Sequence, residues 1–384
     1  MVHRSVATTL ALAGAALAQS SFQPLAAKRF EYDNLPYQAD TDNGERGRQY
    51  GFNMCNSTTQ NQESNCQTAI INSIDDFCLW GPPELGEPVG NIEGEMVAWC
   101  TKEGHGTRVI PDGALQGVQF VRTPHYVQVV GFIDQQKINI LPEDDGGEMD
   151  PHGADQRGNP LGGLVFSNAF GASSTGNGTS SSGSAYQQVI QWHNFMGGST
   201  FCLKACDPSW ENGWAMCEHI FDRIGCKYNA PADYNNINGT FTSCDSDDQL
   251  YPGQYVEGGR TLTYTQPPES LGVINTIPYE PFTPSSSNCQ TLESRSIYTA
   301  GASLVASGSS SASASSATSS GASSSGASSS GASSSGSGAN PTATGSADNA
   351  AQSGSSGSGG NGAGQVVAGG VLGGVGAVLA ALLA

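Results

Sequence analysis

The chain has 384 residues, and its 34 acidic against 15 basic side chains give a formal net charge of −19. This excess of acid argues against nucleic acid and anionic membrane surfaces as partners, and it need signify no more than solubility. The sequence has no phosphate-binding glycine loop and no G-x-S-x-G nucleophile elbow, so neither nucleotide binding nor the α/β-hydrolase class is indicated.

The first segment, MVHRSVATTLALAGAALA, has the pattern of a cleaved secretory signal peptide over residues 1–18. His3 and Arg4 precede an apolar stretch that ends in small residues of the A-x-A type. Residues 19–49 are then expected to be an N-terminal extension. A cut at the dibasic pair Lys28-Arg29 would remove part of it as a pro-segment.

Residues 50–299 are expected to form one folded domain, because every cysteine lies there. The number is even and a secreted chain folds in an oxidising compartment, so five disulfides are expected. The clustering of four and then six cysteines suggests two cross-linked regions, with a bridge between them left open. The ten are Cys55, Cys66, Cys78, Cys100, Cys202, Cys206, Cys217, Cys226, Cys244 and Cys289.

Both helices and strands are predicted in this domain. In CQTAIINSIDDFCLWGPP, residues 66–83, the apolar positions follow a period of 3.6 and predict a helix. Four short β-branched or aromatic runs, EMVAWCT, GVQFVRT, YVQVVGFI and KINIL, predict an antiparallel sheet. A second helix is predicted over residues 213–226, with Gly225 as its stop. The expected fold class is therefore α+β, a disulfide-stapled domain with an antiparallel β-sheet core and a few helices.

The acidic stretch DDGGEMDPHGADQRGNP, residues 144–160, is the strongest candidate for chemistry. It follows a predicted strand, where loops often carry function. The spacing does not fit an EF-hand, because Met149 and Asp155 stand where Gly and Glu are required. Three interpretations stay open: a structural or solvated turn, which the composition favours, a calcium or sugar-contact site, and an acid/base pair. The candidate carboxylates are Asp144, Asp145, Glu148, Asp150 and Asp155.

Other candidates carry less weight. The histidines are isolated in sequence, and His219 is expected to be an ordinary residue of the second helix. Tryptophans could stack on sugar rings, although burial in the core is their usual role; the five are Trp80, Trp99, Trp192, Trp210 and Trp214. The C-x3-C pair at Cys202 and Cys206 lacks a second pair, so no metal and no cofactor are expected.

Three N-glycosylation sequons, at Asn56, Asn177 and Asn238, lie in polar or glycine-rich surroundings. The second lies in GASSTGNGTSSSGSA, residues 171–185, which is expected to be a flexible insertion within the domain. All three are expected to be surface acceptors.

Residues 300–364, which include repeats of GASSS, are expected to form a disordered Ser/Gly/Ala-rich stalk that carries O-linked sugars. The uncharged tail QVVAGGVLGGVGAVLAALLA, residues 365–384, has no basic residue after its apolar stretch. A hydrophobic tail behind a small, polar spacer is the signal for a GPI anchor, so attachment to the outer membrane leaflet is predicted.

Several blocks of the folded part resemble one protein family. They are FNMCNSTTQNQESNCQTAIINSIDDFCLWGPP, GEMVAWCTKEGHGTRVIPDGALQGVQFVRTPHYVQVVGFIDQQKINI, DDGGEMDPHGAD and CEHIFDRIGCKYNAPA. They are similar to the fungal macrophage-activating glycoproteins. The resemblance implies a secreted or GPI-anchored fungal wall protein that acts on host immune cells, and it implies no catalytic residues.

The architecture as a whole predicts a non-catalytic, GPI-anchored glycoprotein of the cell surface or cell wall. Two alternatives use the acidic loop: a surface hydrolase acting on wall polysaccharide, and a calcium-dependent glycan-binding adhesin. Cell-wall polysaccharide or a host-cell receptor is the expected partner.

Overall fold

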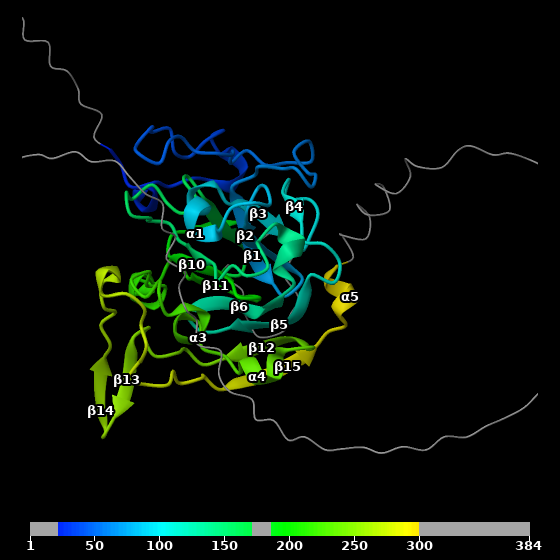
Figure 1. The fold of residues 1–384 in the computed structure, drawn as a ribbon. Helices are drawn as coiled ribbons and strands as arrows, with labels where there is room; N and C mark the ends of the chain where they lie inside the picture. Colours follow the sequence, from blue (N-terminus) through cyan, green and yellow to red (C-terminus); the bar gives the residue numbers. More distant parts are fainter. Residues whose placement is uncertain (1–21, 171–185, 299–384) are drawn as a thin grey trace, which may run out of the picture. The chain divides into compact units, whose positions relative to one another are not determined.

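The computed structural model describes residues 22–170 and 186–298, which form two β-sheets packed face to face (Figure 1). The first sheet has six strands in the order β4 (Arg108–Val109), β3 (Val97–Cys100), β2 (Asp76–Gly81), β1 (Thr68–Ser73), β8 (Leu164–Ser167) and β9 (Gln187–Val189). Its β3–β4 and β1–β8 pairs are parallel and its other pairs are antiparallel.

The second sheet has seven strands in the order β15 (Ser286–Thr291), β12 (Phe241–Ser246), β5 (Leu115–Arg122), β6 (Tyr126–Ile133), β11 (Thr200–Cys206), β10 (Trp192–Gly197) and β7 (Gly147–Met149). All its pairs are antiparallel except β5–β12. A separate hairpin, β13 (Gln254–Glu257) with β14 (Arg260–Thr263), stands out from the edge of the two sheets (Figure 1).

Helices are short and lie outside the sheets. The α-helices are α1 (Val89–Ile92), α2 (Gly213–Met216), α3 (Gly225–Asn229), α4 (Tyr234–Ile237) and α5 (Ser294–Ile297). The 3-10 helices are η1 (Leu25–Ala27), η2 (Tyr32–Asn34), η3 (Glu93–Glu95), η4 (Gln135–Ile138) and η5 (Glu269–Leu271). The predicted α+β class, with a mainly antiparallel sheet core and few helices, is confirmed.

Aromatic side chains from both sheets meet in the main core. The rings of Trp80 and Trp192 lie 5.9 Å apart and those of Phe77 and Phe201 6.2 Å apart, which joins β2 to β10 and β11. The backbone N–H of Trp80 also donates to the side-chain oxygen of Asn194 at 2.9 Å. Burial of large rings at this interface supplies the main apolar contribution to stability.

The outer face of the second sheet is covered by the segment that carries α2, α3 and α4. Val130 and Cys202 on this face pack against Ala230 and Ile237 of the covering segment. The face therefore forms a second, smaller core, in which polar side chains of β10 and β11 are also enclosed.

Five disulfides pair all ten cysteines. Two lie in the first cluster, Cys55–Cys66 and Cys78–Cys100, and three in the second, Cys202–Cys226, Cys206–Cys217 and Cys244–Cys289. The expected five bridges are present, and none crosses between the two clusters.

The predicted helix over residues 66–83 is wrong, because this segment forms the hairpin β1–β2. Both strands are buried almost throughout, so their apolar residues are not restricted to alternate positions. A continuous apolar run of this kind cannot be distinguished from a buried helix by periodicity alone. Cys78 lies directly opposite Cys100 in β3, and their disulfide joins the hairpin to the next strand.

The second predicted helix, residues 213–226, is also wrong in its extent. Only α2 and α3 are helical, and Gly225 begins α3 where it was expected to end the helix. Carbonyls that a continuous helix would use internally are bonded to side chains. His193 binds the carbonyl of Glu218 at 3.2 Å, and the Asn229 amide donates to the carbonyl of Phe221 at 2.9 Å.

The run KINIL is not a strand. Its first residues belong to η4, and Asn139 has a left-handed backbone with φ 66° that breaks an extended run. Ile138 and Ile140 are nevertheless both fully buried, which explains the strand-like alternation in the sequence.

The folded part begins earlier than residue 50. Leu25 is buried, and its backbone N–H donates to the carbonyl of Gln156 at 2.8 Å. Residues from η1 onwards are thus packed on the domain, in the place where a separate extension was expected. The predicted signal (1–18), the insertion 171–185 with Asn177, the stalk (300–364) and the tail (365–384) lie outside the described residues.

Candidate functional site

The acidic loop is held by specific hydrogen bonds from its first residue. The carboxylate of Asp144 accepts the backbone N–H of Val89 at 2.7 Å and that of Gly146 at 2.8 Å. Val89 is the first residue of α1, so Asp144 satisfies a helix N–H that would otherwise have no acceptor. Asp145, its neighbour, is exposed.

Asp150 closes the loop behind β7. One of its carboxylate oxygens accepts the N–H of His152 at 2.7 Å and the N–H of Gly153 at 2.9 Å. Its backbone exchanges two hydrogen bonds of 2.8 Å with Asn159, which brings the two ends of the loop together. The side chain is only 7% exposed, so its charge is stabilised by these donors more than by water.

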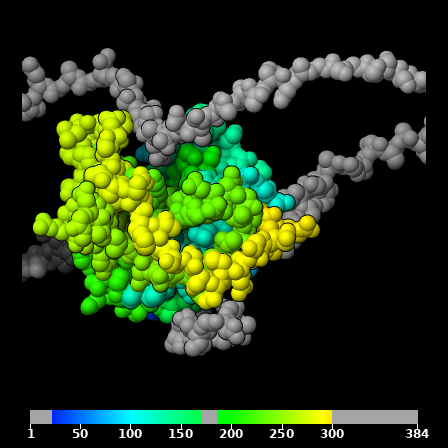
Figure 2. Space-filling view, turned by 90° about the horizontal axis from the view of Figure 1, so that it is seen from below, coloured from blue at the N-terminus to red at the C-terminus, as the bar shows by residue number. Residues whose placement is uncertain are grey.

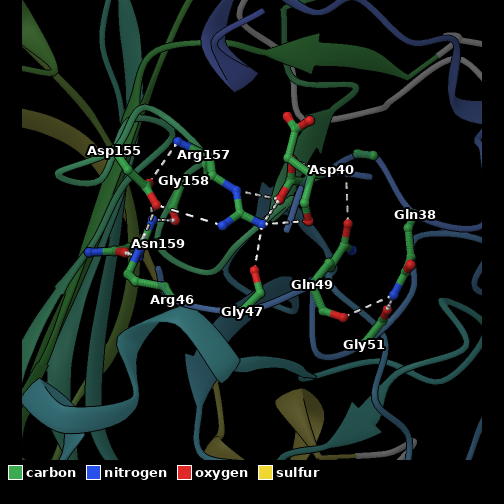
Figure 3. Close-up of polar contacts among 12 residues, drawn as sticks. Gln38, Asp40, Arg46, Gly47, Gln49, Gly51, Asp155, Arg157, Gly158 and Asn159 are labelled. Carbon is green, nitrogen blue, oxygen red and sulfur yellow. Dashed lines mark hydrogen bonds and ion pairs between the residues drawn. The ribbon is translucent and has the colours of Figure 1, made fainter. Parts of the chain in front are cut away.

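Two arginines attach the loop to the N-terminal segment, as Figure 3 shows. Arg157 is buried, and its guanidinium binds the carboxylate of Asp40 through Nε at 2.9 Å and through a terminal nitrogen at 2.7 Å. The same terminal nitrogen donates to the carbonyl of Gly47 at 2.8 Å. Arg46 binds both oxygens of Asp155, at 3.0 Å through Nε and at a shorter contact through a terminal nitrogen.

Glu148 and Glu93 form the centre of a buried carboxyl cluster. Glu93, in η3, accepts the N–H of Glu148 at 3.1 Å and the side-chain amide of Asn159 at 2.9 Å. Burial raises the pKa of Glu93 to about 7, the N–H of Glu148 opposes this, and the charge of Asp150 adds to it. Burial also raises the pKa of Glu148 well above its ordinary value, and the nearby charges of Asp150 and Asp222 contribute.

Three histidines lie beside these carboxyl groups. The rings of His152 and His219 meet edge to face, with centroids 3.9 Å apart. Burial lowers the pKa of His219, against the charge of Asp150, which raises it. His193 is fully enclosed, and burial lowers its pKa well below its ordinary value. We call Glu93, Glu148, Asp150, His152, His193 and His219 the carboxyl–imidazole cluster.

The inner members of this cluster, Glu148, Asp150 and His193, are buried, whereas Glu93, His152 and His219 are partly exposed. Glu148 is 6% exposed, one of its oxygens has no hydrogen-bond partner, and Nε2 of His193 also has none. Donors within the protein already occupy the carboxylates of Asp144, Asp150 and Asp155. Of the interpretations left open, the first, a structural or solvated turn, is favoured in its structural form, because these bonds tie the loop to the domain. A substrate has no approach to Glu148 or His193, so the geometry gives no support to an acid/base pair.

A hollow on the domain surface contains none of the five candidate carboxylates. It has a volume of about 520 Å³ and is lined by residues of β13 and of the segment 278–282, together with Leu250. Within residues 22–170 and 186–298, no group of three or more His, Cys, Asp or Glu side chains is arranged to hold a metal ion.

The tryptophans divide between core and surface. Trp80, Trp99 and Trp192 are buried, whereas Trp214 is 60% exposed. Trp210 is partly buried and stacks on His125, whose ring binds Asp248 at 2.6 Å. The two sequon asparagines that the structure describes, Asn56 and Asn238, are exposed.

Sequence reasoning missed several residues of this site. Glu93 comes from a different segment, and the histidines are far apart in sequence, so only tertiary contacts, among them the pairing of β7 with β10, bring them together. Lys204 was also missed. It lies directly opposite His193 on β11, is fully buried, and binds Gln249 at 2.5 Å and the carbonyl of Asn229. A single charged residue inside the otherwise apolar run FCLKAC was the signal that could have identified it.

No helix among the described residues is both long and apolar enough to cross a membrane. Fold and site together define a class, a disulfide-stapled β protein with two facing sheets, in which the acidic residues of the candidate loop organise the structure.

Two curated proteins from Mycosarcoma maydis are similar to this chain. Appressorium protein ROW1 is 44% identical over 279 residues, which cover 71% of this chain and 59% of ROW1. Appressorium protein ROW2 is 42% identical over 229 residues, which cover 58% of this chain and 73% of ROW2. The chain therefore belongs to the family of these appressorium proteins, and it spans 59% of the length of the first.

No protein-family model matches the chain, and no solved structure matches it. Neither relative is named for an action on macrophages, and the resemblance to the macrophage-activating glycoproteins stays a prediction.

Proposed function

We propose that this chain is a GPI-anchored, N-glycosylated protein of the fungal cell surface or cell wall, and that its folded domain acts there without catalysing a reaction. The observation that carries the proposal is the set of five disulfides in one domain of a family named for the appressorium. Disulfides at this density are typical of secreted and surface proteins and rare in reducing compartments.

Features at both ends of the sequence support the same location. The pattern of residues 1–18 fits a secretory signal, and the apolar tail 365–384 behind a Ser/Gly-rich segment fits a GPI signal. The exposed sequons at Asn56 and Asn238 are accessible to glycosylation. The side chain of Asn56 accepts hydrogen bonds from Thr58, so this sequon already forms a local turn at the surface.

The role is proposed as non-catalytic because four of the five candidate acids are bonded to the protein or enclosed in it, and only Asp145 is exposed. Asp144, Asp150 and Asp155 are occupied by backbone or arginine donors, and Glu148 is enclosed. Recognition by host immune cells would then depend on what the domain and its glycans display.

Localisation in a fungal host tests the proposal. An epitope-tagged full-length chain should reach the cell exterior, and phosphatidylinositol-specific phospholipase C should release it. Deletion of residues 365–384 should send the protein into the medium. The Asn56→Gln and Asn238→Gln variants should each lose one glycan in gel mobility. A chain that stays inside the cell would contradict the surface location, whereas phospholipase-resistant membrane retention would contradict only the anchor.

A further inference from the structure

A surface hollow of about 520 Å³ lies between the hairpin β13–β14 and the segment 278–282. Its walls include Tyr255, Val256 and Glu257 from β13 and Tyr279, Glu280 and Phe282 from the facing segment. We call this site the aromatic hollow. Its size lies within the range of ~300–1,000 Å³ that is usual for ligand sites. Figure 2 shows that the yellow-green and yellow C-terminal part of the domain covers much of the molecule's lower face.

Two tyrosine rings in the lining of the aromatic hollow are stacked on each other. Tyr255 and Tyr279 lie parallel, with centroids 4.6 Å apart and planes 5° from each other. Tyr228 meets Tyr279 edge to face at 5.4 Å. Rings that contact one another in this way lose little freedom when a ligand binds, so the surface they present is preorganised.

Apolar side chains on the rim are left uncovered. Phe282 is 62% exposed and Val256 is 60% exposed, although both line the same hollow. Adjacent exposed apolar residues around a concavity mark a site of interaction more often than scattered ones do.

The only charged residues in the lining are acidic. Glu280 pairs with Lys227 at 2.6 Å, and both side chains are well exposed. No hydrogen bond or ion pair to the described residues occupies the Glu257 side chain. An exposed carboxylate beside aromatic rings attracts a cation. The net charge of −19 also favours a positively charged partner.

We propose that the aromatic hollow binds a polymer of β-linked glucosamine, the cationic amino-sugar class of wall polysaccharide. A sugar ring presents an apolar C–H face to Phe282 and the tyrosine rings, while its ammonium group pairs with Glu257. The uncharged N-acetylated polymer has the same ring faces but lacks the ammonium group. The inference rests on the proposed surface location, where wall polysaccharide is the neighbouring polymer.

Calorimetry with the purified full-length protein tests this site. A glucosamine hexasaccharide should bind, and its N-acetylated counterpart of the same length should bind about tenfold more weakly or not at all. The variant Phe282→Ser/Glu257→Gln should lose about tenfold or more in affinity for the glucosamine form. Both side chains are exposed, so this variant is expected to fold.

The matched control is Leu271→Ser/Glu269→Gln, which makes the same chemical changes at exposed positions that do not line the hollow. It should bind as the wild type does. Equal losses in the two variants would show that only the overall acidity attracts the sugar, and would overturn the site. Binding of hexalysine as tight as that of the hexasaccharide would overturn sugar recognition in favour of a basic peptide. Undetectable binding of the glucosamine form would also overturn the proposal.

The binding experiment uses isolated protein and does not depend on where the chain resides. Failure of sugar binding therefore leaves the surface location intact. A protein that binds glucosamine polymer but stays inside the cell would retain the site and contradict the location.

Discussion

Arg157 and Asp40 form an ion pair in which the two side chains are only 3% and 1% exposed. Desolvation of both charges offsets much of their attraction, so the pair itself adds little net stability. Removal of Arg157, however, leaves the buried Asp40 carboxylate with only Lys28, 3.9 Å away, as a counter-charge. The pair joins the acidic loop to the N-terminal segment, so its loss should release both (Figure 3).

We expect Arg157→Gln to lower the free energy of unfolding by about 3 to 5 kcal/mol, as measured by urea denaturation. The double variant Arg157→Gln/Asp40→Asn should recover part of this loss, because it no longer buries a carboxylate that has lost its guanidinium partner. A double variant that loses the sum of the two single losses would show that the two side chains do not act as a pair.

Glu148 gives a second prediction, on pH. Its pKa is raised in the folded protein, so the folded state holds a proton that the unfolded state releases once the pH exceeds the ordinary value. The contribution of Glu148 to the free energy of unfolding is fully present below its ordinary pKa and is lost as the pH rises through its raised pKa in the folded protein. The contribution of Glu93 to stability falls in the same direction, between its ordinary pKa of 4.5 and its pKa of about 7 in the folded protein.

The variant Glu148→Gln should therefore be more stable than the wild type at pH 8, by about 1 to 3 kcal/mol, and nearly equal to it at pH 4. Thermal melts across this range measure the difference. One Glu148 oxygen has no hydrogen-bond partner, so an amide nitrogen in its place breaks no hydrogen bond of the described residues. A constant offset between the two proteins at every pH would contradict the assigned burial effect.

At the scale of elements, the sequence identified the strands best where residues alternate or are β-branched between clear breaks. The runs that became β3, β5 and β6 were all predicted. The hairpin β1–β2 was not, because both of its faces are buried and its period imitates a helix. Residues 213–226 failed for another reason: side chains from β10 and α3 bind the carbonyls that a helix would need.

The edge strand β15 is exposed along its whole length, and the disulfide Cys244–Cys289 ties it to β12. An exposed strand without buried apolar side chains opens easily unless it is cross-linked. We expect Cys244→Ser/Cys289→Ser to accelerate hydrogen exchange in β15 far more than in β5. In the matched variant Cys206→Ser/Cys217→Ser, the faster exchange should instead appear around α2. Equal acceleration in β15 and β5 would show that the bridge stabilises the whole domain and not the edge.

At the scale of the whole molecule, the β-branched and aromatic runs predicted the sheet core, and the cysteine spacing predicted the two disulfide clusters. They did not predict the carboxyl–imidazole cluster, because its members meet through the pairing of β7 with β10, the approach of η3 and the contact of His219 with His152. The same acidic composition fits a solvated turn and a buried polar core equally well. Only tertiary contacts distinguish Asp144, which accepts two backbone N–H groups, from the exposed Asp145.

The central claim is that the acidic loop organises the structure, and thermal melts of two single variants test this claim most directly. Asp144→Asn should lower the free energy of unfolding by about 1 to 2 kcal/mol, because two backbone donors lose a charged acceptor. Asp145→Asn should change it by no more than about 0.5 kcal/mol. Calcium and chelator should leave all midpoints unchanged. Equal effects of the two variants, or a midpoint that rises with calcium in the wild type alone, would contradict the claim.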